Sequence, residues 1–182
     1  MARPDFTNSR NIIKEIIRVD RAGEYGAKRI YEGQLNYCRN HQTYPTIKHM
    51  MQQEEVHLSY FTNLLLQGNV RPTILMPFWH IIGYVLGSGS ILIGTKTAML
   101  LTQSVEEVIE QHYQKQIDYL EGYIANNLEK ELLDSIKQFQ SDEMEHKDIA
   151  LVQGSNEVVF APLINKIIKL MCNIAISLSK KI

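Results

Sequence analysis

Cysteine is scarce in this chain of 182 residues, which contains only Cys38 and Cys172. The two lie far apart and neither belongs to a C-x-x-C pair. The sequence therefore argues against a disulfide framework and against a zinc site built on thiolates. A reducing compartment is the simpler expectation for such a chain.

An excess of charge of either sign is also absent. The 19 Lys and Arg residues balance 20 Asp and Glu residues, for a formal net charge of −1, and there is no basic run. We therefore expect no nucleic-acid partner. Residues 1–6 lack the apolar core of a secretory signal, and no Arg- and Ser-rich presequence precedes the helical pattern near Thr7. These absences predict a bacterial cytoplasmic protein, with a processed organellar protein as the second interpretation.

What the chain does have is apolar residues at helical spacing over most of its length. We expect one all-α domain over residues 1–182. Four long bundle helices are predicted at residues 9–39, 45–67, 91–123 and 128–153. A last helix at 157–181 opposes apolar residues with lysines, which is typical of an amphipathic helix.

The most informative pattern is a pair of Glu-x-x-His steps, one in the second bundle helix and one in the fourth. At helix positions i and i+3, a carboxylate and an imidazole project from the same face about one turn apart. Each of the other two bundle helices offers a single glutamate. This combination is the ligand set of ferritin-like di-iron and di-manganese carboxylate bundles. The candidate metal ligands are Glu24, Glu54, His57, Glu106, Glu143 and His146.

An internal repeat supports the metal site. A shift of 89 residues maps one Glu-x-x-His step onto the other. A shift of 82 maps the single glutamates onto each other, each followed seven residues later by a tyrosine, Tyr31 or Tyr113. One such step occurs by chance on solvated helices, but both interrupt an apolar seam, where buried carboxylates are costly unless paired or metal-bound. Four carboxylates balance two divalent ions, and mixed carboxylate–imidazole ligation suits iron or manganese.

Acidic neighbours compete with these candidates. Glu107 lies about 100° around the helix from Glu106, whereas Glu110 shares the face of Glu106 and is an additional or replacement candidate. Asp142 directly precedes Glu143. It is either an acceptor for the second N–H of a ligand imidazole or an ordinary exposed acid.

A stretch without formal charge covers residues 74–95 and is long enough to cross a membrane. Pro77, Gly87 and Gly89 predict that it is broken into two pieces. We expect a hydrophobic hairpin segment, at about 74–90, that covers the bundle and dips into the membrane interface. A buried helix at an oligomer interface is the alternative. A redox site beside such a surface favours a lipid-soluble substrate.

Four runs of sequence resemble one family closely. They are residues 17–27 (IRVDRAGEYGA), 71–77 (RPTILMP), 105–113 (VEEVIEQHY) and 142–149 (DEMEHKDI). Together they are similar to the demethoxyubiquinone hydroxylases of ubiquinone biosynthesis. The likeness extends over nearly the whole chain, with no departure at the six candidate ligands.

The resemblance implies a ferritin-like di-iron monooxygenase, peripheral to the membrane, that uses O2 to hydroxylate the ring of demethoxyubiquinol in the penultimate step of the pathway. It implies two iron ions per subunit on the six candidate ligands, with Glu54 and Glu143 bridging the ions or shifting between them. His112 and Tyr113 match a family pair implicated in electron delivery, with electrons accepted from NADH. The cytoplasmic side of a bacterial inner membrane is the implied location, and a homo-oligomer or a ubiquinone-biosynthesis complex the implied assembly.

Two other function classes stay open from the sequence alone. A ferritin-like peroxidase or iron-handling protein would use the same ligands without ring chemistry, but it has no use for the apolar segment. A metal-free, membrane-associated helical adaptor would keep the apolar surfaces and leave four buried carboxylates unexplained.

Overall fold

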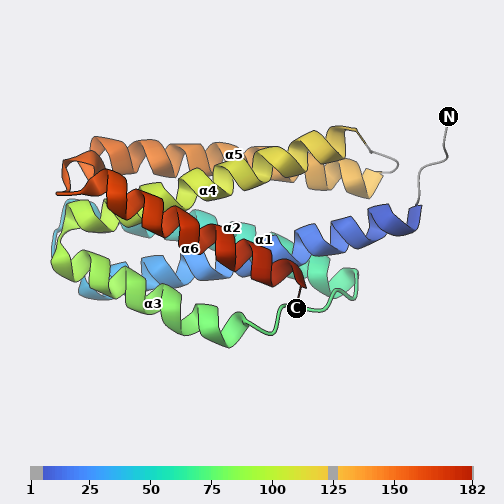
Figure 1. Ribbon diagram of the computed structural model, residues 1–182, viewed down its shortest axis with the longest axis horizontal. Coiled ribbons are helices and arrows are strands. Elements are labelled where there is room, and N and C mark those ends of the chain that lie inside the picture. The colour runs from blue at the N-terminus through green and yellow to red at the C-terminus, as the bar shows by residue number, and fades with distance from the viewer. Residues whose placement is uncertain (1–5, 123–126, 182) are drawn as a thin grey trace.

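The computed structural model describes residues 6–122 and 127–181, and these are almost entirely helical (Figure 1). The helices are α1 (Phe6–Tyr37), α2 (Thr43–Gln67), α3 (Met76–Ile93), α4 (Thr95–Glu121), α5 (Asn127–Val152) and α6 (Ala161–Lys181), with a 3₁₀ turn at Ser155–Glu157. No strand occurs within these ranges, so the prediction of an all-α bundle is confirmed. The last residue of the helix expected at 91–123 lies outside the described residues.

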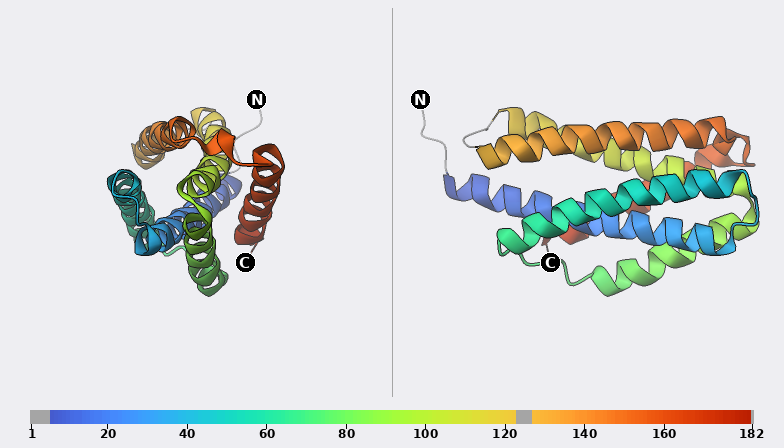
Figure 2. Two further views of the ribbon diagram at one scale, coloured as in Figure 1. Left: turned by 90° about the vertical axis from the view of Figure 1, so that its left-hand side faces the viewer. Right: turned by 180° about the vertical axis from the view of Figure 1, so that it is seen from behind.

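Two helical hairpins form the bundle (Figure 2). Helices α1 and α2 pack together as one hairpin, and α4 and α5 pack together as the other. Helix α3 lies against α1, and α6 packs over α4 and α1 on the outside of the bundle (Figure 1). The ligand-bearing helices thus enclose the centre, while α3 and α6 form an outer pair.

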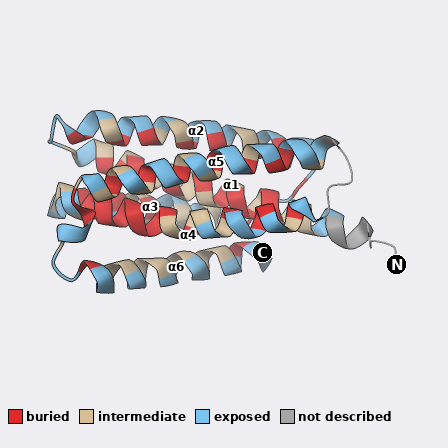
Figure 3. Cartoon of the chain, turned by 90° about the horizontal axis from the view of Figure 1, so that it is seen from above, coloured by how far each residue is buried: buried red, intermediate tan, exposed pale blue. Residues whose placement is uncertain are grey.

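Two of the three apolar clusters of the described residues lie on either side of a polar layer in the bundle. Along α2, Ile47 and Met50 belong to one cluster and Phe61 to the other. The inward positions between them hold Glu54 and His57, which are equally buried. Buried residues line the inner faces of the helices, as Figure 3 shows. Apolar packing on both sides therefore excludes water from the polar layer.

Helix α3 corrects one expectation. The prediction that the segment 74–95 is broken at Pro77 and at Gly87 and Gly89 is wrong, because α3 runs without interruption from Met76 to Ile93. Pro77 lies in its first turn, where the missing N–H costs nothing. The glycines allow close packing on α1: a Cβ at Gly83 would lie 2.8 Å from the Gly26 carbonyl oxygen, and one at Gly87 would overlap the Ile30 carbonyl.

The starts of α4 and α6 also differ from the expected bounds. Helix α4 begins at Thr95, not at 91, because Gly94 has φ 157° and ψ 158°, a conformation that side chains rarely permit. Helix α6 begins at Ala161, not at 157, and Pro162 lies in its first turn. The segment before it turns at Gly154, which has φ 86°.

Helices α3 and α6 are long and apolar enough to cross a membrane, judged by length and composition only. Both carry large apolar side chains that remain exposed on the outside of the bundle. On α3 these include Phe78, Ile81, Val85, Leu92 and Ile93, and on α6 Leu163, Ile167, Leu170, Met171, Ile174 and Leu178.

Candidate metal centre

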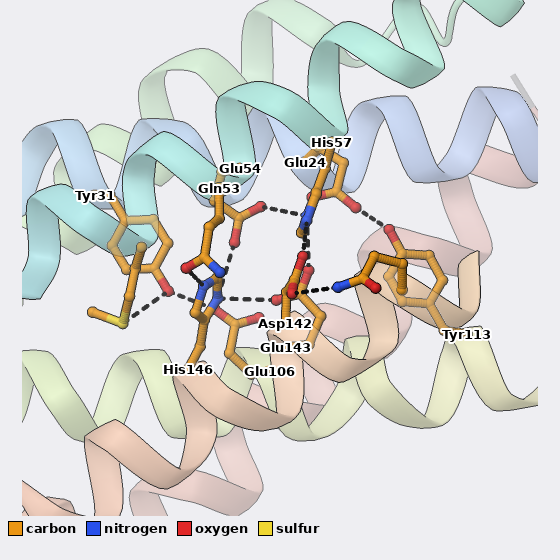
Figure 4. Close-up of polar contacts among 12 residues, drawn as sticks. Glu24, Tyr31, Gln53, Glu54, His57, Glu106, Tyr113, Asp142, Glu143 and His146 are labelled. Carbon is orange, nitrogen blue, oxygen red and sulfur yellow. Dashed lines mark hydrogen bonds and ion pairs between the residues drawn. The ribbon is translucent and has the colours of Figure 1, made fainter. Parts of the chain in front are cut away.

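The six candidate ligands meet at the centre of the bundle (Figure 4). Helix α1 supplies one glutamate, α4 another, and α2 and α5 each supply a Glu-x-x-His pair. Each of the six residues is at most 3% exposed. The inward placement follows from the helical spacing of the pairs, since residues three positions apart share one face.

The six side chains form two overlapping groups. One group combines Glu24 and His57 with two shared glutamates, and the other combines Glu106 and His146 with the same two. Glu54 and Glu143 are the shared members. Within each group the candidate ligand atoms lie within 4.8 Å of one another. The geometry thus offers two adjoining positions for metal ions, with two carboxylates placed between them.

The Nδ1 atoms of both histidines face these carboxylates. His57 Nδ1 lies 3.3 Å from Glu143 Oε1 and 3.7 Å from Glu24 Oε2. His146 Nδ1 lies 3.2 Å from Glu143 Oε2 and 3.4 Å from Glu54 Oε1. Nδ1 is therefore the nitrogen of each imidazole that is aimed at a candidate metal position.

The outer ring nitrogens contact residues of the opposite hairpin. His57 Nε2 lies 3.0 Å from Asp142 Oδ2, so Asp142 is placed as an acceptor and not as an ordinary exposed acid. His146 Nε2 lies 2.9 Å from Gln53 Oε1. Sequence reasoning missed Gln53, although the 89-residue repeat that relates the Glu-x-x-His steps also maps Gln53 onto Asp142.

Two tyrosines hold the single glutamates crosswise. Tyr31 of α1 donates its hydroxyl hydrogen to Glu106 Oε1 at 2.8 Å, and Tyr113 of α4 donates to Glu24 Oε1. Burial raises the pKa of both phenols well above the ordinary value, and nearby glutamate charges raise it further. Both hydroxyls therefore remain donors, each fixing one carboxylate oxygen.

Burial and repulsion raise the pKa of two of the glutamates in the absence of metal. Burial raises the pKa of Glu54 well above its usual range, and the charge of Glu143 raises it further. Burial and Glu143 likewise raise the pKa of Glu106. Four carboxylates crowd one dry site, which favours the protonated form of these two, and a bound cation would favour the charged form.

His57 and Glu143 shift in the opposite sense and form the charged pair of the metal-free site. Burial lowers the pKa of His57, but hydrogen bonds and charge from Glu143 and Glu24 outweigh burial and raise it to about 12. Burial raises the pKa of Glu143, but hydrogen bonds from His146 and His57 outweigh it and lower the pKa to about 2. The central carboxylates thus favour positive charge at this position.

Several atoms of the group lie close to one another but have no hydrogen-bond partner of good geometry, despite full burial. They include both carboxylate oxygens of Glu54 and of Glu143, Oε2 of Glu106, and Nδ1 of both histidines. Unpaired buried polar atoms are costly, and these all point into the same small volume. Oxygen and imidazole donors in this ratio fit iron or manganese, so the residues present could hold two such ions.

The competing acids lie elsewhere. Glu107 faces α6, where Lys169 Nζ lies 2.9 Å and Asn165 Nδ2 3.3 Å from its Oε2. Glu110 pairs with Lys147 Nζ at 2.5 Å and is not among the grouped ligand atoms. The choice of Glu106 over its neighbours therefore agrees with the geometry.

His112 lies beside the centre without entering it. Its Nε2 is 3.3 Å from Oδ1 of Asp20, a buried carboxyl that also accepts from Gln116 Nε2 at 2.7 Å. Burial raises the pKa of Asp20, against the opposing effect of His112. Asp20 and Gln116 were not singled out from the sequence, because a lone acid and a lone amide carry no spacing signal.

Comparison with known proteins agrees with this geometry. The family model described as ubiquinone biosynthesis protein COQ7 matches residues 11–179. The chain is 42% identical over 174 residues to the human "NADPH-dependent 3-demethoxyubiquinone 3-hydroxylase, mitochondrial", covering 96% of this chain and 80% of that protein. It is 41% identical over 174 residues to the Bos taurus protein of the same name, with the same 96% and 80% coverage.

A bacterial relative gives the same picture. The chain is 39% identical over 172 residues to the "3-demethoxyubiquinol 3-hydroxylase" of Rhodospirillum rubrum, covering 94% of this chain and 79% of that protein. The resemblance seen in the sequence is confirmed: the chain belongs to the COQ7 family of ubiquinone biosynthesis proteins.

Proposed function

We propose that the protein is a di-iron monooxygenase that hydroxylates the ring of demethoxyubiquinol with O2, in the penultimate step of ubiquinone biosynthesis. The observation that carries the proposal is the buried pair of overlapping Glu/His groups in a chain of this family. The names printed for the human and Rhodospirillum rubrum relatives describe this hydroxylation for those proteins.

In this proposal the six grouped residues hold two iron ions. Glu24 and His57 serve one position, Glu106 and His146 the other, and Glu54 and Glu143 serve both. When bound, the iron pair supplies the activation of O2 that side chains cannot perform alone. The chain contributes the geometry: tyrosine hydroxyls fix the single glutamates, outer partners orient the imidazoles, and apolar layers exclude water.

An apolar cavity of about 350 Å³ suits a lipid-soluble quinol. It lies between α1, α3, α4 and α6, and its lining includes Phe78, Trp79, Ile109 and Met171. Small residues of α1, among them Gly23 and Gly26, open this wall, so the cavity reaches the backbone on either side of Glu24. The ring of a quinol there would lie next to the metal-binding helices.

The exposed apolar faces of α3 and α6 suit a membrane surface from which such a substrate enters. These two helices also line the cavity, so a protein resting on them would open it toward lipid. The expected location is the cytoplasmic side of a bacterial inner membrane, where a homo-oligomer or a complex of ubiquinone-biosynthesis enzymes would assemble.

Electrons come from a reduced nicotinamide in this proposal. The resemblance seen in the sequence implies NADH as the electron donor. The human and Bos taurus relatives are instead named as NADPH-dependent. Tyr113 is hydrogen-bonded to Glu24, and His112 is the half-buried residue beside it. The family resemblance implies that this pair delivers electrons. The contact of Tyr113 with Glu24 and the 13% exposure of the His112 side chain are compatible with that role.

The direct test supplies the purified, iron-loaded, reduced protein with demethoxyubiquinol and isotopically labelled O2. Mass spectrometry should find one labelled oxygen atom in the quinol product. Consumption of O2 with iron oxidation and no labelled quinol would overturn the proposal and favour the ferritin-like peroxidase or iron-handling alternative.

A further inference from the structure

The two candidate ligand imidazoles are held by partners of different charge (Figure 4). His57 Nε2 lies 3.0 Å from a carboxylate oxygen of Asp142. His146 Nε2 lies 2.9 Å from the amide oxygen of Gln53. With a metal ion bound at each Nδ1, each imidazole would carry its proton on Nε2 and donate it outward. Both histidines thus have the same tautomer, but one hydrogen bond ends on an anion and the other on a neutral group.

The remainder of the two positions is closely matched. Each has one single glutamate that accepts from a tyrosine, and both share Glu54 and Glu143. The histidines themselves are equally buried. Asp20 adds a further buried acid on the side of Glu24, where its Oδ1 lies 3.3 Å from His112 Nε2 and accepts from Gln116 Nε2 at 2.7 Å. The outer acceptor is therefore the clearest difference between the two positions.

Asp142 is built to act on its histidine. Its other oxygen accepts from Gln138 Nε2 at 3.1 Å, one helical turn earlier on α5. Its side chain is 19% exposed, so most of it is removed from water. A carboxylate held in this way is oriented toward the ring and only partly screened.

A carboxylate acceptor strengthens the hydrogen bond and makes the opposite ring nitrogen a stronger donor to a metal ion. We propose that Asp142 and Gln53 are positioning residues that make the two metal positions unequal. The position served by His57 binds a divalent ion more tightly and releases it more slowly than the position served by His146. This inference rests on the di-metal site of the proposed function.

The experiment titrates the metal-free full-length protein with Mn²⁺ and follows free and bound ion by electron paramagnetic resonance. Outer partners of ligand histidines typically change metal affinity by about 10- to 100-fold. The wild type should bind in two steps separated by that order of magnitude. His57→Ala should remove the tight step, and His146→Ala the weak one.

Two substitutions make the positions alike in opposite ways. Asp142→Asn gives both histidines an amide acceptor, and should weaken the tight step by about 10- to 100-fold while leaving the weak step unchanged. Gln53→Glu gives both a carboxylate, and should tighten the weak step alone. Circular dichroism checks that each variant keeps its helices. If Asp142→Asn does not fold, the titration of Gln53→Glu tests the inference by itself.

Two equal steps in the wild type would overturn this inference and leave the proposed function standing. An Asp142→Asn variant that folds and weakens both steps equally, or neither, would do the same. Absence of any bound Mn²⁺ in the wild type would overturn the di-metal site and the inference together.

Discussion

Four glutamates and two histidines lie buried at the centre of the bundle, whereas large apolar side chains of α3 and α6 lie on its surface. Burying charge and exposing apolar area both cost stability unless something compensates. Inside, two bound cations would compensate the charge of the four buried glutamates. Outside, contact with a lipid surface, as proposed above, would remove the apolar side chains from water. In the proposed function the two regions therefore have different ligands, two metal ions inside and a lipid surface outside, with the apolar cavity between them.

The substitution with the largest expected effect is Glu143→Ala, in the buried centre. Glu143 belongs to both groups, so its removal should empty both metal positions and abolish ring hydroxylation. The loss should exceed the roughly 100-fold that outer partners of ligands cost. Elemental analysis of the purified variant and a product assay measure the two effects. Retention of both metal and activity would contradict the assignment of the centre.

The proposed membrane face on α3 and α6 is tested by the double variant Ile81→Asp with Ile167→Asp. These side chains are 62% and 51% exposed on α3 and α6. Each large apolar side chain contributes about 1.5 kcal/mol or more when buried, so binding to lipid vesicles should fall by roughly 100-fold. Metal content should not change, because neither residue is near the ligands.

A matched control for the vesicle experiment is Val56→Asp, since Val56 is 63% exposed but lies on α2. Sedimentation with vesicles of mixed neutral and anionic lipid measures the binding of all three proteins. Equal losses for the control and the double variant would contradict a membrane face formed by α3 and α6.

The interior was more predictable from the sequence than the exterior. The ligand glutamates and histidines were predicted because buried charge within an apolar seam is rare, and the two halves repeat it. Gln53 was missed because an amide is ordinary on a helix, although the repeat places it opposite Asp142. A second copy of a motif thus carries information about its neutral neighbours as well.

The course of α3 could be determined only from its packing against α1. Gly87 and Gly89 locally favour a break in α3, yet in the structure the helix is unbroken, and Gly83 and Gly87 permit its close contact with α1. The helix ends instead at Gly94, between α3 and α4. No sequence pattern distinguishes Gly94 from Gly87 and Gly89 as the position of the break. Local propensity was overridden by helix packing.

A change of pH also separates the two regions, because the central glutamates and histidines titrate and the exposed apolar side chains of α3 and α6 do not. In the metal-free protein, the pKa of His57 is raised from 6.5 to about 12, so its contribution to stability is complete below pH 6.5 and is lost as the pH rises toward 12. The raised pKa values of Glu54 and Glu106 also make stability fall as the pH rises above 4.5. Glu143 acts oppositely, since its contribution is complete above pH 4.5 and is lost as the pH falls toward 2.

The melting temperature of the metal-free protein should therefore fall between about pH 5 and pH 9. Bound cations replace these protons, so the melting temperature of the metal-loaded protein should exceed that of the metal-free protein by an amount that grows as the pH rises over this range. Thermal melts of loaded and chelated protein, followed by circular dichroism, measure the gap between them. A gap that stays constant with pH would show that the central groups do not exchange protons for metal.

The smallest expected effect comes from Tyr31→Phe, which removes one hydroxyl from the interior and leaves its shape intact. The hydroxyl donates to Glu106 at 2.8 Å, and its loss leaves a buried carboxyl oxygen without a partner. The free energy of unfolding of the metal-free protein should fall by about 1 to 2 kcal/mol, measured by urea denaturation. Tyr44→Phe, at a tyrosine that is 41% exposed, should change it by less than about 0.5 kcal/mol. Equal effects at the two tyrosines would mean that the centre gains no more from a hydrogen bond than the surface does, which its exclusion of water forbids.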